Sequence, residues 1–187
     1  MITINCAKLE KNLGKPGLVR QYGIDRTNCD YIMFLDADDV LAPNAVEILN
    51  NAIRRDGYEY INSAFYQQHD GKFDVIPPHQ ITWLHGNIYS RKFLEKWDIR
   101  FDDRLNEDGS FNFKCFWLAE KKGIIQQPMA YWLENKKSLT RNKDDFMIDI
   151  AGDYVNTYAD AIRFVVKKKP EVLENKKFLA DCAGKLS

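Results

Sequence analysis

The stretch YIMFLDADDV, residues 31–40, constrains the fold more than any other part of this 187-residue chain. Residues 31–36 form an apolar run of strand length that ends at Asp36, and Asp38 and Asp39 follow after a single alanine. A strand without polar alternation is typical of a sheet that is covered on both faces, as in a parallel sheet. We therefore expect a buried strand at 31–36 that carries three carboxylates to the end of a sheet.

The rest of the chain alternates between strand and helix patterns. Further strands are expected at 2–5, 58–68, 70–76 and 129–134, with Asp70-Gly71 as a hairpin turn. Helices are expected at 18–27, 44–55, 91–98, in the later part of 101–122, at 147–169 and in a shorter stretch after Pro170. Strands that alternate with helices favour the α/β class. The length and a hydrophobic content of 45% are enough for one domain with a sizeable core.

Composition excludes several classes of protein. Lysine plus arginine number 27 and aspartate plus glutamate number 27, so the net charge is zero and no nucleic-acid partner is expected. No apolar run reaches the roughly 18 residues of a membrane span, and the first residues lack the basic and apolar regions of a leader peptide. The four cysteines are isolated and lack metal-ligand spacing, which argues against zinc and favours reduced thiols. We therefore expect a cytoplasmic protein.

Three carboxylates this close together need a physical explanation. They raise one another's pKa unless a cation joins them, and Mg²⁺ or Mn²⁺ binds through one or two carboxylates together with substrate phosphates. Ligands of open α/β sheets bind outside the carboxyl ends of the strands, where Asp36 and Asp38 are expected. The alternative is an Asp-rich turn that caps a helix led by Pro43. The letters D-x-D-D alone leave both interpretations open.

The residues around this stretch resemble a known family. Between Asn12 and Leu49 the elements NLGKPG, LVRQYG, YIMFLDADD and LAPNAVEIL follow one another. In this order they closely resemble the Gly-rich loop, arginine-bearing helix, Asp-rich strand end and Pro-led helix of the family-two inverting glycosyltransferases, which have the GT-A fold. The resemblance implies a Rossmann-like, mixed but mainly parallel sheet that is flanked by helices.

The resemblance continues through three later segments. HGNIYSRKFLEKWDIRF (85–101), RLNEDGSFNFKCF (104–116) and YWLENKKSLTR (131–141) look like the family's tyrosine-and-arginine segment, its acidic acceptor-side motif and its Ser-Leu-Thr-Arg loop. The resemblance covers about 2–145 in the family's order. It implies a partial GT-A glycosyltransferase domain at 1–145 and a C-terminal helical extension at 146–187.

The donor side of the site falls, by resemblance, on the first half of the chain. Asp36 is expected to contact the ribose or uracil of a nucleotide-sugar, and Asp38, together with Asp36, to hold the Mn²⁺ or Mg²⁺ that bridges the diphosphate. Arg20 matches the motif arginine that faces the nucleotide, and its alternative role is a surface salt bridge with Asp25. Asp39 is expected to cap the helix that follows it.

The acceptor side falls on the second acidic motif. Asp108 matches the base that takes the proton of the acceptor hydroxyl in an inverting transfer, and Glu107 would orient Asp108 or meet the acceptor. The alternative for this pair is to neutralise the dipole of a helix that starts at Phe111. Arg141 is expected to reach the leaving diphosphate, with a free loop charge equally open. His85 is expected to make a structural hydrogen bond.

Two further groups of side chains have simple expected roles. Lys15 is expected to be solvated rather than bound to phosphate. The tryptophans are expected mostly in the core, with one of them available to stack on a sugar ring: Trp83, Trp97, Trp117 and Trp132.

One large element of the family pattern has no counterpart in this sequence. The first strand–helix–strand unit of the family holds much of the nucleotide base, so the chain is expected to be N-terminally truncated. A bare edge beside strand 31–36 would be a strong pairing site. We therefore expect a homo-oligomer, or a partner chain that completes the sheet.

Two classes of function follow from the resemblance. The first is transfer of a sugar, with inversion, from a nucleotide-sugar that is UDP-linked to a glycan, lipid-linked or protein acceptor, with peripheral membrane contact as an option. The second is a catalytically impaired GT-A-like remnant that acts as a binding or structural module in an oligomer or a larger assembly.

Overall fold

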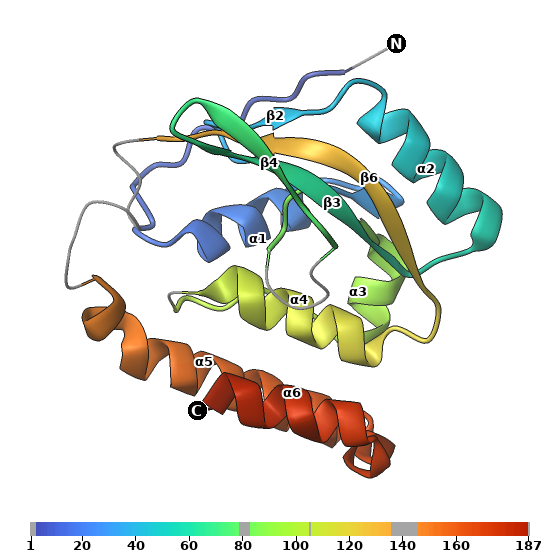
Figure 1. Ribbon diagram of the computed structural model, residues 1–187, viewed down its shortest axis with the longest axis vertical. Coiled ribbons are helices and arrows are strands. Elements are labelled where there is room, and N and C mark those ends of the chain that lie inside the picture. Colours follow the sequence, from blue (N-terminus) through green and yellow to red (C-terminus); the bar gives the residue numbers. More distant parts are fainter. Residues whose placement is uncertain (1–2, 79–82, 105, 136–145, 187) are drawn as a thin grey trace.

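The computed structural model describes residues 3–78, 83–104, 106–135 and 146–186, with only the helical backbone for 146–151. Figure 1 shows a curved sheet with helices on both sides and a pair of C-terminal helices as a further layer. The elements in chain order are α1 (Pro16–Arg26), β1 (Tyr31–Ile32), β2 (Val40–Leu41), α2 (Ala45–Asp56), β3 (Tyr60–His69), β4 (Lys72–Ile76), β5 (Ile88–Ser90), α3 (Arg91–Trp97), α4 (Glu107–Leu118), β6 (Lys122–Trp132), α5 (Phe146–Lys168), η1 (Pro170–Glu174) and α6 (Lys176–Leu186).

The described strands form one six-stranded sheet in the order β1-β5-β3-β6-β2, with β4 beside β3. This confirms the mixed α/β class with flanking helices. The prediction of a mainly parallel sheet is wrong. Among the described pairings only β3 with β6 is parallel, and the other pairs are antiparallel. A parallel pair needs a crossover connection, which α3 and α4 supply between β3 and β6. The antiparallel pairs have no such requirement.

The hairpin of β3 and β4 is confirmed, and its turn explains its direction. Asp70 and Gly71 both have positive φ, 49° and 74°. Two consecutive residues of this kind form the turn that matches the twist of an antiparallel pair, and Gly and Asp are among the residues that favour it. The strands therefore pair in tight register, with His69 opposite Lys72.

The apolar run at 31–36 is a strand for only two residues, so the expected long buried strand is wrong. Its apolar side chains are used in packing instead of in a backbone ladder. The ring centroid of Phe34 lies 5.2 to 5.8 Å from the centroids of three other aromatic rings: Tyr89, Phe101 and Phe111. The strand expected at 2–5 is also wrong for residues 3–5, which have no strand pairing, and Ile4 is 82% exposed.

The other expected elements are confirmed, with shifted ends. The helices expected at 44–55, 91–98 and 147–169 are α2, α3 and α5. Helix α4 begins at Glu107 rather than near Phe111, and β6 begins before residue 129. The earlier start of α4 places Glu107 and Asp108 inside a helix instead of in the loop before it.

Two apolar cores lie on opposite faces of the sheet. The larger core combines α4 with the C-terminal helices through buried residues such as Phe111, Phe113, Tyr158, Val165 and Phe178. The smaller core packs α2 against the other face, with these buried residues among its members: Leu49, Ile53, Ile61, Ile88 and Met129. Helix α4 therefore lies between the sheet and the layer of α5 and α6, as Figure 1 shows.

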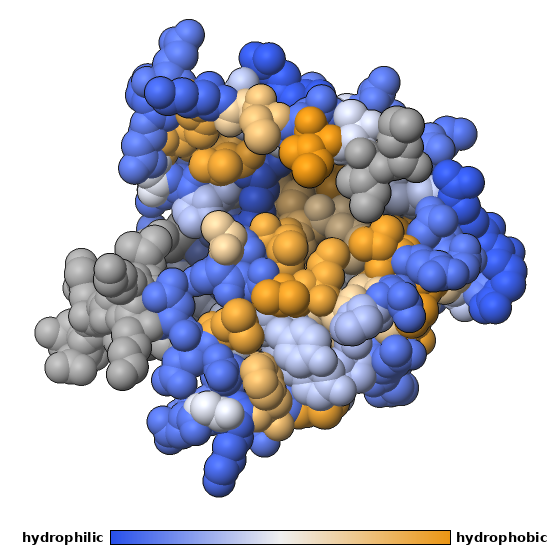
Figure 2. Space-filling view, turned by 90° about the horizontal axis from the view of Figure 1, so that it is seen from above, coloured by the Kyte–Doolittle hydropathy of each residue, from blue (hydrophilic) through white to orange (hydrophobic). Residues whose placement is uncertain are grey.

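One end of the sheet carries an apolar surface. Strand β1 ends the strand order and pairs only with β5 among the described strands. A hollow of about 550 Å³ lies beside it and is lined in part by Met33, Val46 and Ile88. Figure 2 shows apolar side chains gathered on the face seen from above, bordered by hydrophilic ones. Within the described ranges, none of the helices is both long and apolar enough to cross a bilayer.

Candidate active site

The aspartates that follow β1 diverge instead of sharing one centre. Asp36 accepts a hydrogen bond from Nη2 of Arg20 at 2.7 Å, and Asp38 accepts one from Nδ2 of Asn135 at 2.7 Å. The backbone N–H of Asp39 donates to the carbonyl of Asp36 at 3.0 Å, as in a turn. Asp36 and Asp38 therefore each have a polar partner, and these partners relieve the repulsion that the close spacing of the two carboxylates would otherwise cause.

Asp39 is buried and does not cap α2, so its expected role is wrong. Its carboxylate accepts the backbone N–H of Leu133 at 3.1 Å and lies 3.3 Å from Nδ1 of His85. Helix α2 begins only at Ala45, after Asn44, and a capping side chain must reach the first turn from the residue directly before it. Asp39 instead holds His85, which therefore has the structural contact expected for it.

Arg20 of α1 joins the two acidic segments. Its guanidinium donates to Asp36 at 2.7 Å and to Oε1 of Glu107 at 2.5 Å, and its side chain is 16% exposed. Burial acts to lower the pKa of Arg20, but the Asp36 and Glu107 carboxylates raise it above its ordinary value, so the group stays charged. The alternative salt bridge with Asp25 is wrong, because Asp25 pairs with Arg100 at 2.8 Å.

Glu107 and Asp108 occupy the first turn of α4, which the chain enters through Asn106 at φ 64°. Oδ1 of Asp108 accepts the N–H of Gly109 at 2.7 Å. Burial raises the pKa of Asp108 despite that hydrogen bond and the nearby Arg20, and burial together with Asp108 raises the pKa of Glu107. A raised pKa suits a carboxylate that must take up a proton. Both side chains also meet the positive end of the helix dipole, so they fulfil the structural role at the same time.

A small hollow brings together side chains from both acidic segments. Its volume is about 30 Å³ and its lining consists of Arg20, Phe34, Asp36, Leu84, His85 and Asp108. A hollow of this size has room for only a few water molecules. A sugar ring is larger, so a donor would lie at the open mouth of the hollow rather than inside it. Asp38 does not belong to the lining.

The donor atoms present decide what metal this region can hold. Within the described ranges, no group of three or more His, Cys, Asp or Glu side chains is placed to hold an ion. Asp38 contributes an exposed carboxylate, whereas Asp36 is bound by Arg20. Mg²⁺ needs only one or two protein carboxylates when phosphates and waters supply the other oxygens. The residues therefore fit a cation that binds at Asp38 together with a diphosphate, and they do not form a complete metal site by themselves.

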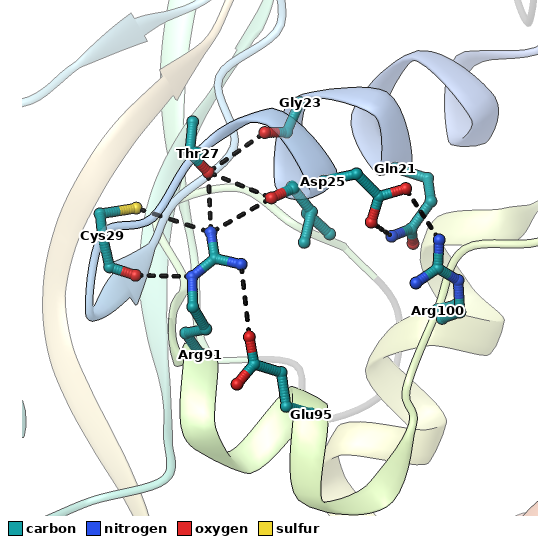
Figure 3. Close-up of polar contacts among 9 residues, drawn as sticks. Gln21, Gly23, Asp25, Thr27, Cys29, Arg91, Glu95 and Arg100 are labelled. Atoms are coloured by element: carbon teal, nitrogen blue, oxygen red, sulfur yellow. Dashed lines mark hydrogen bonds and ion pairs between the residues drawn. The ribbon is translucent and has the colours of Figure 1, made fainter.

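The sequence patterns did not single out Arg91, which is the first residue of α3. Figure 3 shows its guanidinium directed at the end of α1, where it donates to the carbonyl of Cys29 at 2.7 Å, to Oγ1 of Thr27 at 2.8 Å and to the carbonyl of Ile24 at 3.2 Å. A cation at the start of a helix is opposed by the helix dipole, which is the signal that its side chain serves another element. Arg91 thus anchors the helix that carries Arg20.

The remaining candidates lie away from the hollow or beside it. Lys15 precedes α1 and is absent from the lining, and Arg141 lies outside the described residues. Trp132 stacks on His85 with ring centroids 5.1 Å apart, which places one tryptophan beside the hollow. One tryptophan is buried and three are half-buried: Trp117, and then Trp83, Trp97 and Trp132. The sequence patterns also missed the contacts of Phe34, Leu84 and Asn135.

Comparison with known proteins gives two results for the sequence. Residues 3–122 match the profile of the family described as Glycosyl transferase family 2. The chain is also 24% identical over 146 residues to a protein of Bacillus subtilis (strain 168) named Uncharacterized glycosyltransferase EpsJ, a match that covers 65% of this chain and 42% of that protein.

The fold is similar to that of TarS from S. aureus. The crystal structure of TarS 1–349 in complex with UDP-GlcNAc matches with a TM-score of 0.75 at 16% identity, over 96% of this chain and 55% of that one. The complex with UDP matches with a TM-score of 0.70 at 16% identity, over 94% and 52%. The chain spans about half the length of these relatives.

Proposed function

The chain belongs to glycosyl transferase family 2, and from this premise we propose that it takes part in sugar transfer from a nucleotide-sugar, with the hollow between Asp36 and Asp108 as the reaction centre. The donor is UDP-linked and the transferred group is a hexose. This choice is supported by TarS, which has this fold and has been crystallised with UDP-GlcNAc and with UDP. The acceptor is a glycan, a lipid-linked sugar or a protein.

The observation that carries the proposal is the position of Arg20. It binds one carboxylate of each acidic segment, Asp36 at 2.7 Å and Glu107 at 2.5 Å. A guanidinium presents a planar fork that suits phosphate as well as carboxylate. Since the Asp36 side chain is 44% exposed, that carboxylate can turn toward solvent or a nucleoside while Arg20 faces a donor phosphate. The contacts of Arg20 with both acidic segments support its proposed role as the link between the donor and acceptor sides.

The donor side consists of residues with distinct proposed tasks. Asp36 contacts the nucleoside, and Asp38 would hold Mn²⁺ or Mg²⁺ together with the diphosphate, with Asp36 as the second proposed carboxylate ligand. When bound, the cation stabilises the negative charge of the leaving diphosphate. Arg141 belongs to the same proposal as a second positive charge for that leaving group.

The acceptor side requires one group that takes a proton. In an inverting transfer the acceptor oxygen forms a bond to the anomeric carbon as the bond from that carbon to the diphosphate oxygen breaks. Asp108 takes the proton of the acceptor hydroxyl, and Glu107, fixed by Arg20, keeps the first turn of α4 in place. Burial raises the pKa of Asp108, which makes it a stronger base than an exposed aspartate.

The proposal is tested by replacing the base alone. Release of UDP from UDP-GlcNAc is measured for the wild-type chain and for Asp108→Asn, together with UDP binding by calorimetry. The substitution keeps the size of the side chain and removes the proton acceptor, so turnover should fall about 10²- to 10⁴-fold while UDP affinity stays within twofold. Turnover that survives the substitution would rule out Asp108 as the base.

A second candidate is a module that binds partners without catalysing transfer. The observation that favours it is the apolar hollow of about 550 Å³ beside β1, at the end of the sheet. In this alternative, a second copy or a partner chain adds a strand to β1 and covers that hollow. Light scattering after size exclusion tests this directly, because the module requires a dimer or a larger assembly.

The location proposed with the sugar-transfer function is the cytoplasm, with peripheral contact to a membrane where the acceptor is lipid-linked. The cysteines support a reducing compartment, since all four are free thiols.

A further inference from the structure

The first turn of α4, which carries Asp108, is packed against a tyrosine of α5. Tyr158 is fully buried, with 0% exposure. A Cβ atom placed on Gly109 would clash with the hydroxyl oxygen of Tyr158 and would lie 3.1 Å from its Cζ. Gly109 directly follows Asp108, so the tyrosine hydroxyl packs closely against the residue next to the proposed base.

Tyr158 also meets the residue that starts this turn. Asn106 enters α4 at φ 64°, a left-handed conformation that is uncommon outside glycine, and its side-chain nitrogen lies on the same side of Gly109 as the Tyr158 hydroxyl, 3.1 Å from the position that a Cβ would take. Tyr158 thus lies beside the residues that flank Glu107 and Asp108. A second contact also connects the segment before α4 with α5, because Arg104 forms an ion pair with Asp160 of α5 at 2.7 Å.

We infer that Tyr158 is a positioning residue: its hydroxyl packs against Gly109 next to Asn106, and so fixes the direction in which Asp108 faces the hollow. The catalytic part of this inference rests on the proposed function, in which Asp108 is the base. The inference gives the C-terminal helices a task in the reaction, although they lie outside the matched residues 3–122.

Removal of the hydroxyl alone should loosen the turn. Without it, a gap opens beside Gly109 and Asn106, so the backbone between them can shift toward α5. A shift of about 1 Å at a reacting group can lower a rate by about 10²-fold, whereas it leaves binding of the distant nucleotide unchanged. A purely structural role would instead lower stability without separating these two quantities.

The test is a pair of complementary substitutions in the full chain. Hydrogen exchange of the Ser110 amide, which donates to the carbonyl of Asn106 at 3.3 Å, reports the local opening of the turn. Tyr158→Phe should accelerate this exchange about tenfold, and Gly109→Ala should do the same because its methyl group clashes with the hydroxyl. The double variant should return to within twofold of wild type, since the added methyl group occupies the vacated space.

Val165→Ala is the matched control, because Val165 is equally buried on the same helix but is not among the contacts of Gly109. It should lower the melting temperature and leave Ser110 exchange unchanged. In the UDP-GlcNAc assay, Tyr158→Phe should lower kcat about tenfold with KM within twofold, and the double variant should recover most of kcat.

Two results would overturn the inference: Ser110 exchange in Tyr158→Phe equal to wild type, or additive effects of the two substitutions in the double variant. A wild-type chain that neither binds UDP nor releases it would refute the proposed function instead. In that case, hydrogen exchange of Ser110 in the two single variants and the double variant still decides whether Tyr158 fixes the turn that carries Asp108.

Discussion

Arg20 and Arg91 are equally buried arginines with different kinds of partner. Each side chain is 16% exposed. Arg91 donates mainly to backbone carbonyls and a hydroxyl at the end of α1, as Figure 3 shows, whereas Arg20 is bound by the side-chain carboxylates of Asp36 and Glu107. Burial therefore does not distinguish a structural arginine from a functional one.

The difference lies in whether the partner can leave. Backbone carbonyls are fixed by the chain, so the contacts of Arg91 can only hold α1 and α3 together. A carboxylate on a side chain can rotate away, and a phosphate can take its place on the guanidinium fork. Under the proposed function, Arg20 is therefore held ready for an anionic ligand, and Arg91 maintains the position of the helix that carries Arg20.

The largest expected effect on stability belongs to Arg91→Ala. It would leave the carbonyls of Cys29 and Ile24 without their charged donor, at a cost of about 3 kcal/mol in the free energy of unfolding. The loss should be nearly the same at pH 5 and pH 8, because carbonyls do not titrate in this range and the ion pair with the exposed Glu95, at 3.6 Å, contributes little. Urea unfolding at both pH values measures it, and a loss that varies with pH would remove the contrast with Arg20.

Arg20→Ala should lower the free energy of unfolding by a smaller amount at low pH than at high pH. Arg20 lowers the pKa of both Glu107 and Asp108, so its removal raises those pKa values further. The folded variant then holds more protons than the unfolded chain, and its stability falls as pH rises. We expect a loss of about 2 kcal/mol at pH 8 that shrinks toward pH 5. A loss independent of pH would show that the carboxylates are not its main partners.

Glycines on α1 test how closely this helix packs against the acidic turn. A Cβ on Gly17 would come within 2.6 Å of the carbonyl of Asp102 and of Cγ of Glu107, whereas a Cβ on Gly23 meets nothing within 4 Å. Gly17→Ala should therefore lower stability by about 1 kcal/mol, because an overpacking cost of about 2 exceeds a helix gain of about 1. Gly23→Ala is the control and should raise stability by up to about 1 kcal/mol. Equal effects would contradict the close contact.

The smallest effect concerns the pH dependence that Asp108 itself contributes. Burial raises its pKa above the ordinary 3.8, so the folded chain binds more protons than the unfolded chain just above that pH. Its contribution to stability is complete below about pH 4 and is lost as pH rises through the raised pKa. Asp108→Asn should therefore give a shallower fall in unfolding free energy between pH 4 and pH 7. An unchanged slope would mean that Asp108 is solvated.

Local patterns predicted the elements whose signals are local. The helix at 44–55 has an apolar face, and the turn at Asp70-Gly71 needs only its own two residues, so both were found from the sequence. The prediction of a buried strand at 31–36 failed because this run has the composition of such a strand. Its Phe34 instead packs on the aromatic rings of Tyr89, Phe101 and Phe111, which lie far away in the sequence. Periodicity cannot reveal such contacts.

The candidate site shows the same division. Resemblance indicated the acidic residues, but it did not predict that Arg20 binds Glu107, or that Asp39 pairs with His85 instead of capping a helix. These partners lie far apart in the chain, and only the packing of α1 against α4 and of the sheet against its loops brings them together. The helix start at Glu107 was also missed, although asparagine is a residue type that often precedes a helix, because Asn106 enters α4 at positive φ and makes no side-chain cap.

The central claim is that a nucleotide diphosphate binds at the mouth of the hollow beside Arg20, together with a divalent cation that Asp38 would hold. Calorimetric titration of UDP with Mn²⁺ into the wild-type chain, Asp38→Ala and Asp30→Ala tests it most directly, with Asp30 as an exposed aspartate before β1. The account predicts Mn²⁺-dependent binding by the wild type and Asp30→Ala, and at least a tenfold weaker affinity for Asp38→Ala. Absence of UDP binding in the wild type, or equal affinity in all three, would contradict it.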